Sequence, residues 1–146
     1  MDVVKGAGSS VGPDVQIFQS TFKAGDMLSA SCSPQNGQCM DGRKVAANGS
    51  FVLVMAGTHC HAPNCMRQDL INLDTNETLC SSIPVHGQTE DVFHEQGYIS
   101  TPPCTWGSAK EGFLPPPVLY RNTTLQMLTY YNSTWGHPGQ MGIWQV

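Results

Sequence analysis

The sequence predicts an all-β protein, a sandwich or a barrel, stapled by disulfides. Three observations lead to this class. No stretch shows sustained helical periodicity, turn-forming Gly, Pro, Asn, Ser and Thr recur every several residues, and the runs between them are short and rich in β-forming residues. The chain has 15 Gly and 10 Pro in 146 residues, a length that fits one domain with its own core. We therefore expect a single β-sandwich domain over residues 1–146.

The expected strands are the short runs between turn signals. "NLDTNETL" is expected to join two of them as a hairpin with its turn at Asp74–Glu77, because Asp and Asn favour turns. "NSTWGHPG" is expected to join the last two strands as a longer loop. Phe113–Pro117 cannot form a central strand, because proline lacks an N–H, and is expected to be a crossover or an edge segment. In chain order the expected strands are Val15–Phe18, Phe51–Cys60, Met66–Leu73, Thr78–Ile83, Gly97–Ile99, Val118–Tyr120, Thr124–Tyr131 and Gln140–Val146.

Cysteines and glycosylation sequons indicate an extracellular protein. An even number of cysteines suits an oxidised framework, and several Asn-x-Ser/Thr sequons lie in turn-like stretches. The cysteines are Cys32, Cys39, Cys60, Cys65, Cys80 and Cys104, and the sequons begin at Asn48, Asn76, Asn122 and Asn132.

The pairing of these cysteines can be predicted only in part. The first 50 residues fit the strand pattern least well, and residues 31–44 are expected to form an exposed loop that a Cys32–Cys39 bridge spans. Cys60 and Cys65 are too close for easy strand geometry, so each is expected to reach across to one of the two remaining cysteines, Cys80 or Cys104. Which of these each one meets stays open.

Composition limits the location and the partners. The N-terminal "MDVVKGAGSS" lacks the features of a signal peptide, so a leader is expected to lie outside this sequence. No apolar run approaches the roughly 18 residues that span a bilayer. The net charge of −4 and the pI near 5.6 argue against nucleic acid and anionic membranes as partners. The expected partners are other copies, or other domains of a larger extracellular protein.

The segment "FVLVMAGTHCHAPNC" carries the most distinctive chemistry. Residues i and i+2 of a strand project from one face, so His59 and His61 are expected to share a face and could share a metal ion. Cys60 is expected to point the other way, together with Val52, Val54 and Ala56. A His-x-His pair on an exposed strand often binds nothing, so the interpretation depends on a third ligand.

The C-terminal segment "WGHPGQMGIWQV" offers that third ligand. Met141 opens the last expected strand, with Met141, Ile143 and Gln145 on one face. Methionine usually fills cores, but beside two imidazoles its thioether selects a soft ion such as Cu(I). His137 is a further candidate ligand or a supporting hydrogen-bond donor. The remaining histidines, His86 and His94, lie in turn-like segments and are expected to face solvent.

A His-x-His pair that ends an apolar strand, followed about eighty residues later by a methionine on a terminal hairpin, resembles a known copper domain. It is similar to the C-terminal domain of the copper type II, ascorbate-dependent monooxygenases, such as peptidylglycine α-hydroxylating monooxygenase. In that family two histidines and one methionine hold the catalytic copper on a jelly-roll sandwich. The resemblance implies a jelly-roll-like antiparallel β-sandwich with one copper ion on His59, His61 and Met141, and, for an enzyme, a copper-dependent monooxygenase or oxidase.

A second resemblance covers most of Phe51–Val146. The chain is similar to plant stress-up-regulated nodulation-type proteins and to related uncharacterised algal and protist proteins. These share the His-x-His pair, a strand like "TLCSSIP", a "GYI" segment at Gly97–Ile99 and an ending like "GHPGQM" at Gly136–Met141.

The chain departs from the monooxygenases in one respect. Those enzymes use two domains and two copper ions, and a cluster of three histidines holds the second copper, which supplies an electron. This chain has room for one domain and has no adjacent His-His pair. Two-copper hydroxylation is therefore not implied.

Three functions from different classes follow. The first is an extracellular copper-binding domain that could be redox active. The second is a structural or adhesive subunit of a glycosylated assembly, in which the histidines have no catalytic role. The third is a carbohydrate-binding module whose stacking residues would be Trp106, Trp135, Trp144, Tyr130 and Tyr131.

Overall fold

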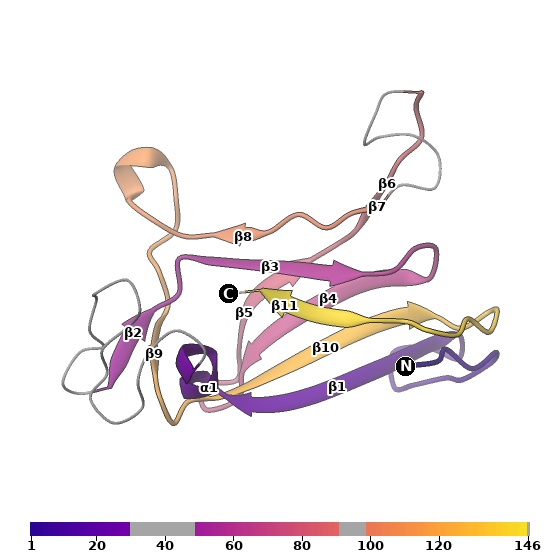
Figure 1. Cartoon of the computed structure of the whole chain (residues 1–146), viewed down its shortest axis with the longest axis horizontal. Coiled ribbons are helices and arrows are strands. Elements are labelled where there is room, and N and C mark those ends of the chain that lie inside the picture. The colour runs from indigo at the N-terminus through magenta and orange to yellow at the C-terminus, as the bar shows by residue number, and fades with distance from the viewer. Residues whose placement is uncertain (30–48, 91–98, 146) are drawn as a thin grey trace.

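The protein is an antiparallel β-sandwich, which confirms the predicted fold class. The structure is a computed structural model that describes residues 1–29, 49–90 and 99–145. Figure 1 shows its two main layers, whose inner faces share one core. The four-stranded sheet has the order β1 (Val15–Lys23), β10 (Thr124–Asn132), β4 (Cys65–Asn72) and β5 (Glu77–Ser82). The three-stranded sheet has the order β11 (Gly142–Gln145), β3 (Met55–Cys60) and β8 (Cys104–Thr105).

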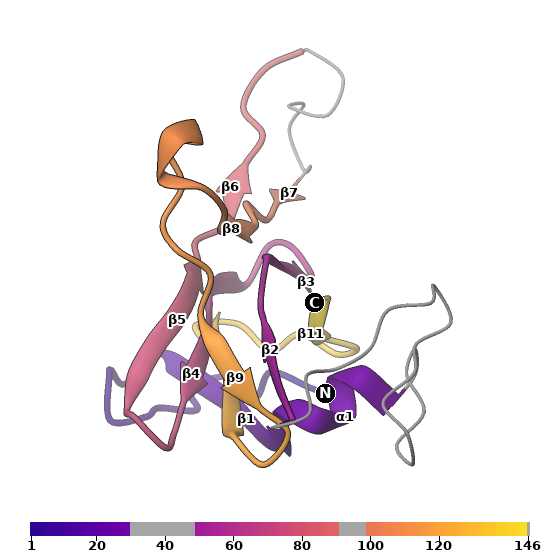
Figure 2. The same cartoon turned by 90° about the vertical axis from the view of Figure 1, so that its left-hand side faces the viewer.

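Smaller elements lie around these layers. One ribbon and a helix lie together at one end of the sandwich, and a second ribbon projects from it, as Figure 2 shows. The first ribbon is β2 (Ser50–Val52) with β9 (Val118–Tyr120), and the helix is α1 (Ala24–Ser29). The second ribbon is β6 (Val85–His86) with β7 (Ile99–Ser100), and a 3₁₀ turn, η1 (Ala109–Glu111), follows β8.

The core consists of two clusters of buried side chains. The larger lies between the sheets, with the half-buried Trp144 packed against it, and comprises Ala24, Leu53, Ala56, Leu70, Cys80, Leu119 and Leu125. The smaller lies near the end of β3 and comprises Val3, Cys60, Cys65 and Tyr131. Burial of these side chains supplies the main driving force for bringing the sheets together.

Several predicted elements are confirmed. β4 and β5 form the expected hairpin, and Asn76 adopts a φ of 55° in its turn, a conformation that Asn tolerates better than most residues. β9 occupies the predicted Val118–Tyr120, and Phe113–Pro117 forms no strand. The jelly-roll connectivity stays a prediction.

The N-terminal part contains more structure than the sequence indicated. β1 continues past Phe18 to Lys23, because all nine of its residues pair with β10. Helix α1 follows directly, and the Ala24 N–H donates to the Thr123 carbonyl at 2.9 Å. The expected loop over residues 31–44 and the Cys32–Cys39 bridge lie outside the described residues.

The expected strand Phe51–Cys60 is wrong as a single element. β2, which pairs with β9, ends at Val52, and the chain joins the three-stranded sheet as β3 at Met55. Between the two strands, the Leu53 N–H donates to the Pro117 carbonyl at 3.0 Å. Because of this change of sheet, the alternation of inward and outward side chains in β3 does not continue that of β2. Ala56 and Cys60 point inward as predicted, whereas Val52 and Val54 are 52% and 58% exposed.

The expected cysteine pairing is also wrong. Cys60 bonds to Cys65, with their Cα atoms 6.1 Å apart, and Cys80 bonds to Cys104. The prediction assumed that Cys60 and Cys65 lie in extended strand backbone, where two cysteines so close in sequence do not easily form a disulfide. Instead β3 and β4 belong to different sheets, so the short link between them turns across the sandwich and brings both sulfurs inside.

The last two strands change sheet in the same way. β10 lies in the four-stranded sheet and β11 in the three-stranded sheet, so they do not form the terminal hairpin that the sequence suggested. The "NSTWGHPG" segment is the connection that crosses between the layers. Each disulfide also joins one layer to the other, since β8 pairs with β3 and β5 pairs with β4.

We predict that the two disulfides stabilise the fold unequally. Replacing Cys80 and Cys104 with Ala should lower the free energy of unfolding by about 3 kcal/mol, and replacing Cys60 and Cys65 by about 2 kcal/mol, because a longer closed loop restricts the unfolded chain more. The sequence separations are 24 and 5 residues. Guanidinium denaturation measures both losses, and peptide mapping without reduction checks the pairing. A smaller loss for the Cys80–Cys104 pair would contradict this ordering.

Gly142 marks a close approach between the sheets. A Cβ atom there would overlap Thr129 Oγ1 and lie 3.1 Å from Thr129 Cβ. We predict that Gly142→Ala lowers the free energy of unfolding by about 1–3 kcal/mol through overpacking. Gly57→Ala is the matched control on the neighbouring strand, because its Cβ would meet only the Gln145 carbonyl at 3.9 Å. Equal denaturation midpoints for the two variants would show that β11 shifts at no cost.

Candidate metal site

His59 and His61 lie at the end of β3 and point away from the core. Cys60 between them is only 2% exposed, whereas His59 is exposed and His61 is half-buried. The disulfide holds Cys60 inside, and strand alternation then directs both imidazoles outward. The sequence-based assignment of these three side chains to two faces is therefore confirmed.

The two imidazole rings are close enough to share an ion. Their centroids are 5.1 Å apart, and the ring planes are nearly perpendicular at 87°. A tetrahedral ion about 2 Å from one nitrogen of each ring would place the centroids roughly 5 Å apart. Aromatic rings also adopt this edge-to-face arrangement without a metal, so the third ligand decides the interpretation.

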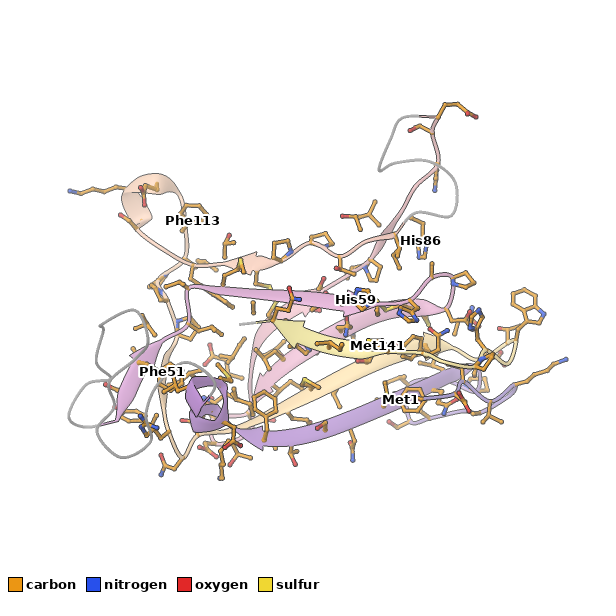
Figure 3. The ribbon with its side chains drawn as sticks, in the orientation of Figure 1. Met1, Phe51, His59, His86, Phe113 and Met141 are labelled. Carbon is orange, nitrogen blue, oxygen red and sulfur yellow. A yellow bond between two sulfur atoms is a disulfide. The ribbon has the colours of Figure 1, made fainter. Side chains whose placement is uncertain are left out.

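Met141 directly precedes the strand that pairs with the end of β3. β11 pairs antiparallel with β3, with Gly142 opposite Cys60 and Ile143 opposite His59. Met141 lies one residue before β11, and continuing this register by one step would place it opposite His61. Met141 and Ile143 are exposed, as the predicted alternation requires. Figure 3 shows His59 on β3 and Met141 beside the start of β11.

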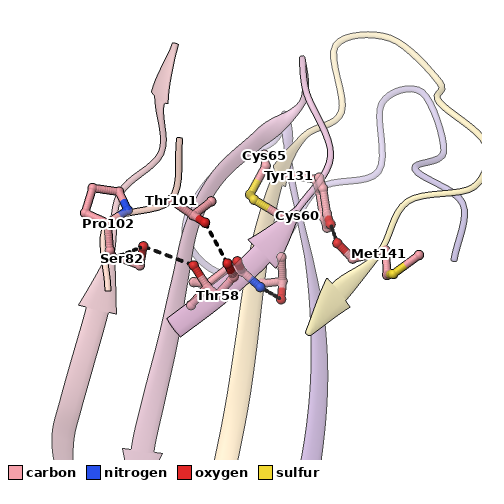
Figure 4. Close-up of a disulfide and its surroundings, with 10 residues drawn as sticks. Thr58, Cys60, Cys65, Ser82, Thr101, Pro102, Tyr131 and Met141 are labelled. Carbon is pink, nitrogen blue, oxygen red and sulfur yellow. Dashed lines mark hydrogen bonds between the residues drawn. A yellow bond between two sulfur atoms is a disulfide. The ribbon is translucent and has the colours of Figure 1, made fainter. Parts of the chain in front are cut away.

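The backbone of Met141 is fixed by a buried tyrosine. Tyr131 at the end of β10 is fully buried, and its hydroxyl donates to the Met141 carbonyl at 2.7 Å (Figure 4). Phe18 packs edge-on against its ring at a centroid distance of 5.6 Å. This hydrogen bond crosses between the layers and fixes where β11 begins.

A chain of hydrogen bonds fixes β3 from its other side. Thr58 Oγ1 donates to Ser82 Oγ at 3.1 Å, and Ser82 Oγ donates to the Pro102 carbonyl at 2.8 Å. Thr101 Oγ1 donates to the Thr58 carbonyl at 2.6 Å, which completes the arrangement in Figure 4. β3 is therefore held on both edges next to the histidines.

His61 is oriented by the loop that carries Met141. Its Nδ1 lies 3.1 Å from the Gly139 carbonyl oxygen. A carbonyl can only accept, so this hydrogen bond requires a proton on Nδ1 and leaves the lone pair of Nε2 available. Metal-binding histidines commonly use this arrangement, in which the second nitrogen donates to a backbone carbonyl.

His137 is less suited to a metal. The Gln140 side-chain amide contacts its Nδ1. The Pro138 carbonyl lies 3.2 Å from the same Nδ1. The backbone of His137 pairs with Val3. The contacts of its ring therefore lie within its own loop.

The other candidate residues lie elsewhere or are not described. His86 is exposed on β6, and His94 lies outside the described residues. Within residues 1–29, 49–90 and 99–145, no group of three or more His, Cys, Asp or Glu side chains has metal-binding geometry. The third candidate ligand, Met141, is a methionine, a residue type outside that set.

The sequons and the aromatic residues have different surroundings. Asn76 and Asn122 are exposed in turns, Asn132 is half-buried at the end of β10, and Asn48 lies outside the described residues. Of the proposed stacking residues, Trp106 and Trp144 pack against the core, Tyr130 and Tyr131 are buried, and Trp135 is 70% exposed. Trp135 is thus the member of this group whose face is open to a sugar.

Sequence reasoning missed the supporting residues Tyr131 and Gly139. A signal for Tyr131 was available, because strand alternation in β10 places it on the same inner face as Leu125, Met127 and Thr129. No comparable signal identified Gly139, since its contact with His61 joins segments 78 residues apart.

In the described part of the chain, no helix has the length and apolar character that crossing a bilayer requires.

Comparison of the chain with protein-family models, curated proteins and solved structures finds no match. The contacts around His59, His61 and Met141 are therefore the basis for assigning a function.

We predict that Tyr131→Phe lowers the free energy of unfolding by about 1 kcal/mol at neutral pH, because it removes a buried hydrogen bond. The effect should depend on pH in the alkaline range. Burial raises the pKa of Tyr131 to about 12, so as the pH rises above about 10 the unfolded chain loses this proton first. This contribution to stability is full below pH 10 and is lost as the pH approaches 12.

Denaturation curves between pH 7 and 12 measure this effect. The wild type should lose stability above pH 10 more steeply than Tyr131→Phe. Tyr120→Phe is a suitable control because Tyr120 is 47% exposed. Parallel alkaline slopes for the wild type and Tyr131→Phe would contradict the expected linkage.

Proposed function

We propose that this chain is an extracellular domain that binds one copper ion through His59, His61 and Met141. The observation that carries the proposal is the pair of imidazoles 5.1 Å apart on an exposed sheet face, with Met141 directly before the strand that pairs with β3. The hydrogen bond from His61 Nδ1 to Gly139 supports it, because it leaves Nε2 free to act as a ligand.

The set of donor atoms favours copper in its reduced state. Two neutral imidazole nitrogens and one thioether sulfur form a soft, uncharged set that suits Cu(I) better than a hard cation such as Mg²⁺ or Ca²⁺. Three protein ligands would leave room for an external molecule on the ion. Since His59 and Met141 are exposed, a small molecule can approach this site from solvent.

Copper would supply one-electron redox chemistry, and the protein would hold the ligands in place. The Cys60–Cys65 disulfide keeps both histidines outward, and Tyr131 fixes the start of β11. A monooxygenase or oxidase reaction at this site would need an external reductant, because the sequence lacks the His-His pair of the two-copper enzymes that it resembles. The same ligands would also serve a copper carrier or store.

A second candidate is a structural subunit of a glycosylated extracellular assembly. The observation that favours it is a group of exposed apolar side chains on and beside the β2–β9 ribbon, since such groups commonly mark contacts between proteins. Between 47% and 58% of the surface of each is exposed: Val52, Val54, Val118 and Tyr120. In this role the two disulfides between the layers would stiffen the subunit.

We predict that the wild type binds one equivalent of Cu(I) with a dissociation constant below micromolar in competition with a chromophoric Cu(I) chelator. His59→Ala, His61→Ala and Met141→Ala should each weaken binding by more than about 100-fold, since loss of a ligand exceeds the 10–100-fold effect of supporting residues. X-ray absorption should detect one sulfur neighbour in the wild type and none in Met141→Ala.

Two exposed residues provide matched controls. His86→Ala removes an imidazole from β6, and Met55→Ala removes a thioether from the other end of β3. Both should keep the wild-type affinity. Wild-type binding no tighter than micromolar would contradict the copper proposal, and an oligomer in sedimentation that persists after chelation would then favour the structural role.

A further inference from the structure

We propose that the N-terminal segment, residues 1–3, is part of the metal site, with Asp2 and Gly139 as positioning residues for His61 and Met141. The inference rests on the proposed copper function, but it also makes a claim about the metal-free protein. Residues at the start of the chain hold the loop that orients both ligands, and they act through the backbone of that loop.

The N-terminal segment pairs with this loop through backbone hydrogen bonds. The Gln140 N–H donates to the Met1 carbonyl at 2.6 Å, and the Met1 backbone nitrogen donates to the Gln140 carbonyl at 3.0 Å. Val3 and His137 exchange two hydrogen bonds, at 2.8 and 2.9 Å. Val3 is also buried against Cys60, Cys65 and Tyr131, which seats the segment beside the end of β3.

The peptide group between Gly139 and Gln140 connects this segment to His61. Its N–H donates to Met1, and its carbonyl accepts from His61 Nδ1 at 3.1 Å. Hydrogen bonds in such a chain polarise one another, so the bond to Met1 strengthens the carbonyl as an acceptor. A stronger acceptor favours the tautomer that leaves Nε2 free.

Asp2 fixes the conformation of Gly139. Its Oδ1 accepts the Gly139 N–H at 2.9 Å, and Gly139 has a φ of 71°. This left-handed conformation suits glycine and strains other residues. Met141 follows two residues later, and its carbonyl accepts from Tyr131. The loop is therefore held by Asp2 at Gly139 and by Tyr131 at Met141, and the ring of His61 hydrogen-bonds to the Gly139 carbonyl within this stretch.

The test compares variants of Asp2 that keep or lose the acceptor. Asp2→Ala removes it, whereas Asp2→Asn keeps a side-chain carbonyl that can accept from Gly139. Gly139→Ala strains the loop directly. Asp14→Ala controls for loss of an N-terminal carboxylate, and Gly112→Ala controls for the same backbone strain, because Gly112 has a φ of 83° and, like Gly139, no neighbour within 4 Å of its Cβ position.

The first measurement is the His61 tautomer in the metal-free protein, by ¹⁵N NMR. The wild type, Asp2→Asn and both controls should carry the proton on Nδ1. Asp2→Ala and Gly139→Ala should populate the other tautomer as well. A merely structural role for Asp2 would change the melting temperature without changing the tautomer.

The second measurement is Cu(I) affinity, by competition with a chelator. Asp2→Ala and Gly139→Ala should weaken binding by about 10-fold, whereas Asp2→Asn should stay within about 2-fold of the wild type. Unchanged tautomer and unchanged affinity in Asp2→Ala and Gly139→Ala would overturn the inference. If the wild type binds no Cu(I), the proposed function fails, and with it the metal role of Asp2. The NMR result then still decides separately whether the segment orients His61.

Discussion

The covalent attachment of the two sheets through Cys60 and Cys65 is the constraint on which the candidate site depends. The disulfide draws Cys60 into the core at the point where the chain passes from β3 to β4. In an extended strand, a residue fixed inward forces both of its neighbours outward. His59 and His61 therefore face solvent together as a consequence of how the sheets are joined, and the second disulfide holds the same layers together at β5 and β8.

A second set of contacts acts on the strand that carries Met141. β11 approaches β10 closely because Gly142 leaves room for Thr129, and the hydroxyl of Tyr131 reaches the Met141 carbonyl. The β10 residues in these two contacts, Thr129 and Tyr131, are two positions apart and both point inward. The position of the Met141 backbone is thus set by packing between the layers.

The exposure of the site is consistent with the chemistry proposed for it. Uncharged nitrogen and sulfur ligands near the surface bind a soft ion without the cost of burying a charge without a partner. The supporting hydrogen bonds come from backbone groups and from the N-terminal segment. With copper bound, such a site would combine a rigid support with an accessible ion, which would suit both copper transfer and reaction with a small molecule.

The fold class, most of the strands and the shared face of His59 and His61 could be predicted from the sequence alone. These depend on local signals: turn residues at short intervals and the two-residue period of a strand. The sequence also supplied Met141 as a candidate ligand. The tertiary structure decided the cysteine pairing and the break between Val52 and Met55, because both depend on which sheet a strand joins. The contacts of Gly139 with Asp2 and with His61 appeared only in the folded chain, since hydrogen bonds between distant segments leave no local pattern in a sequence.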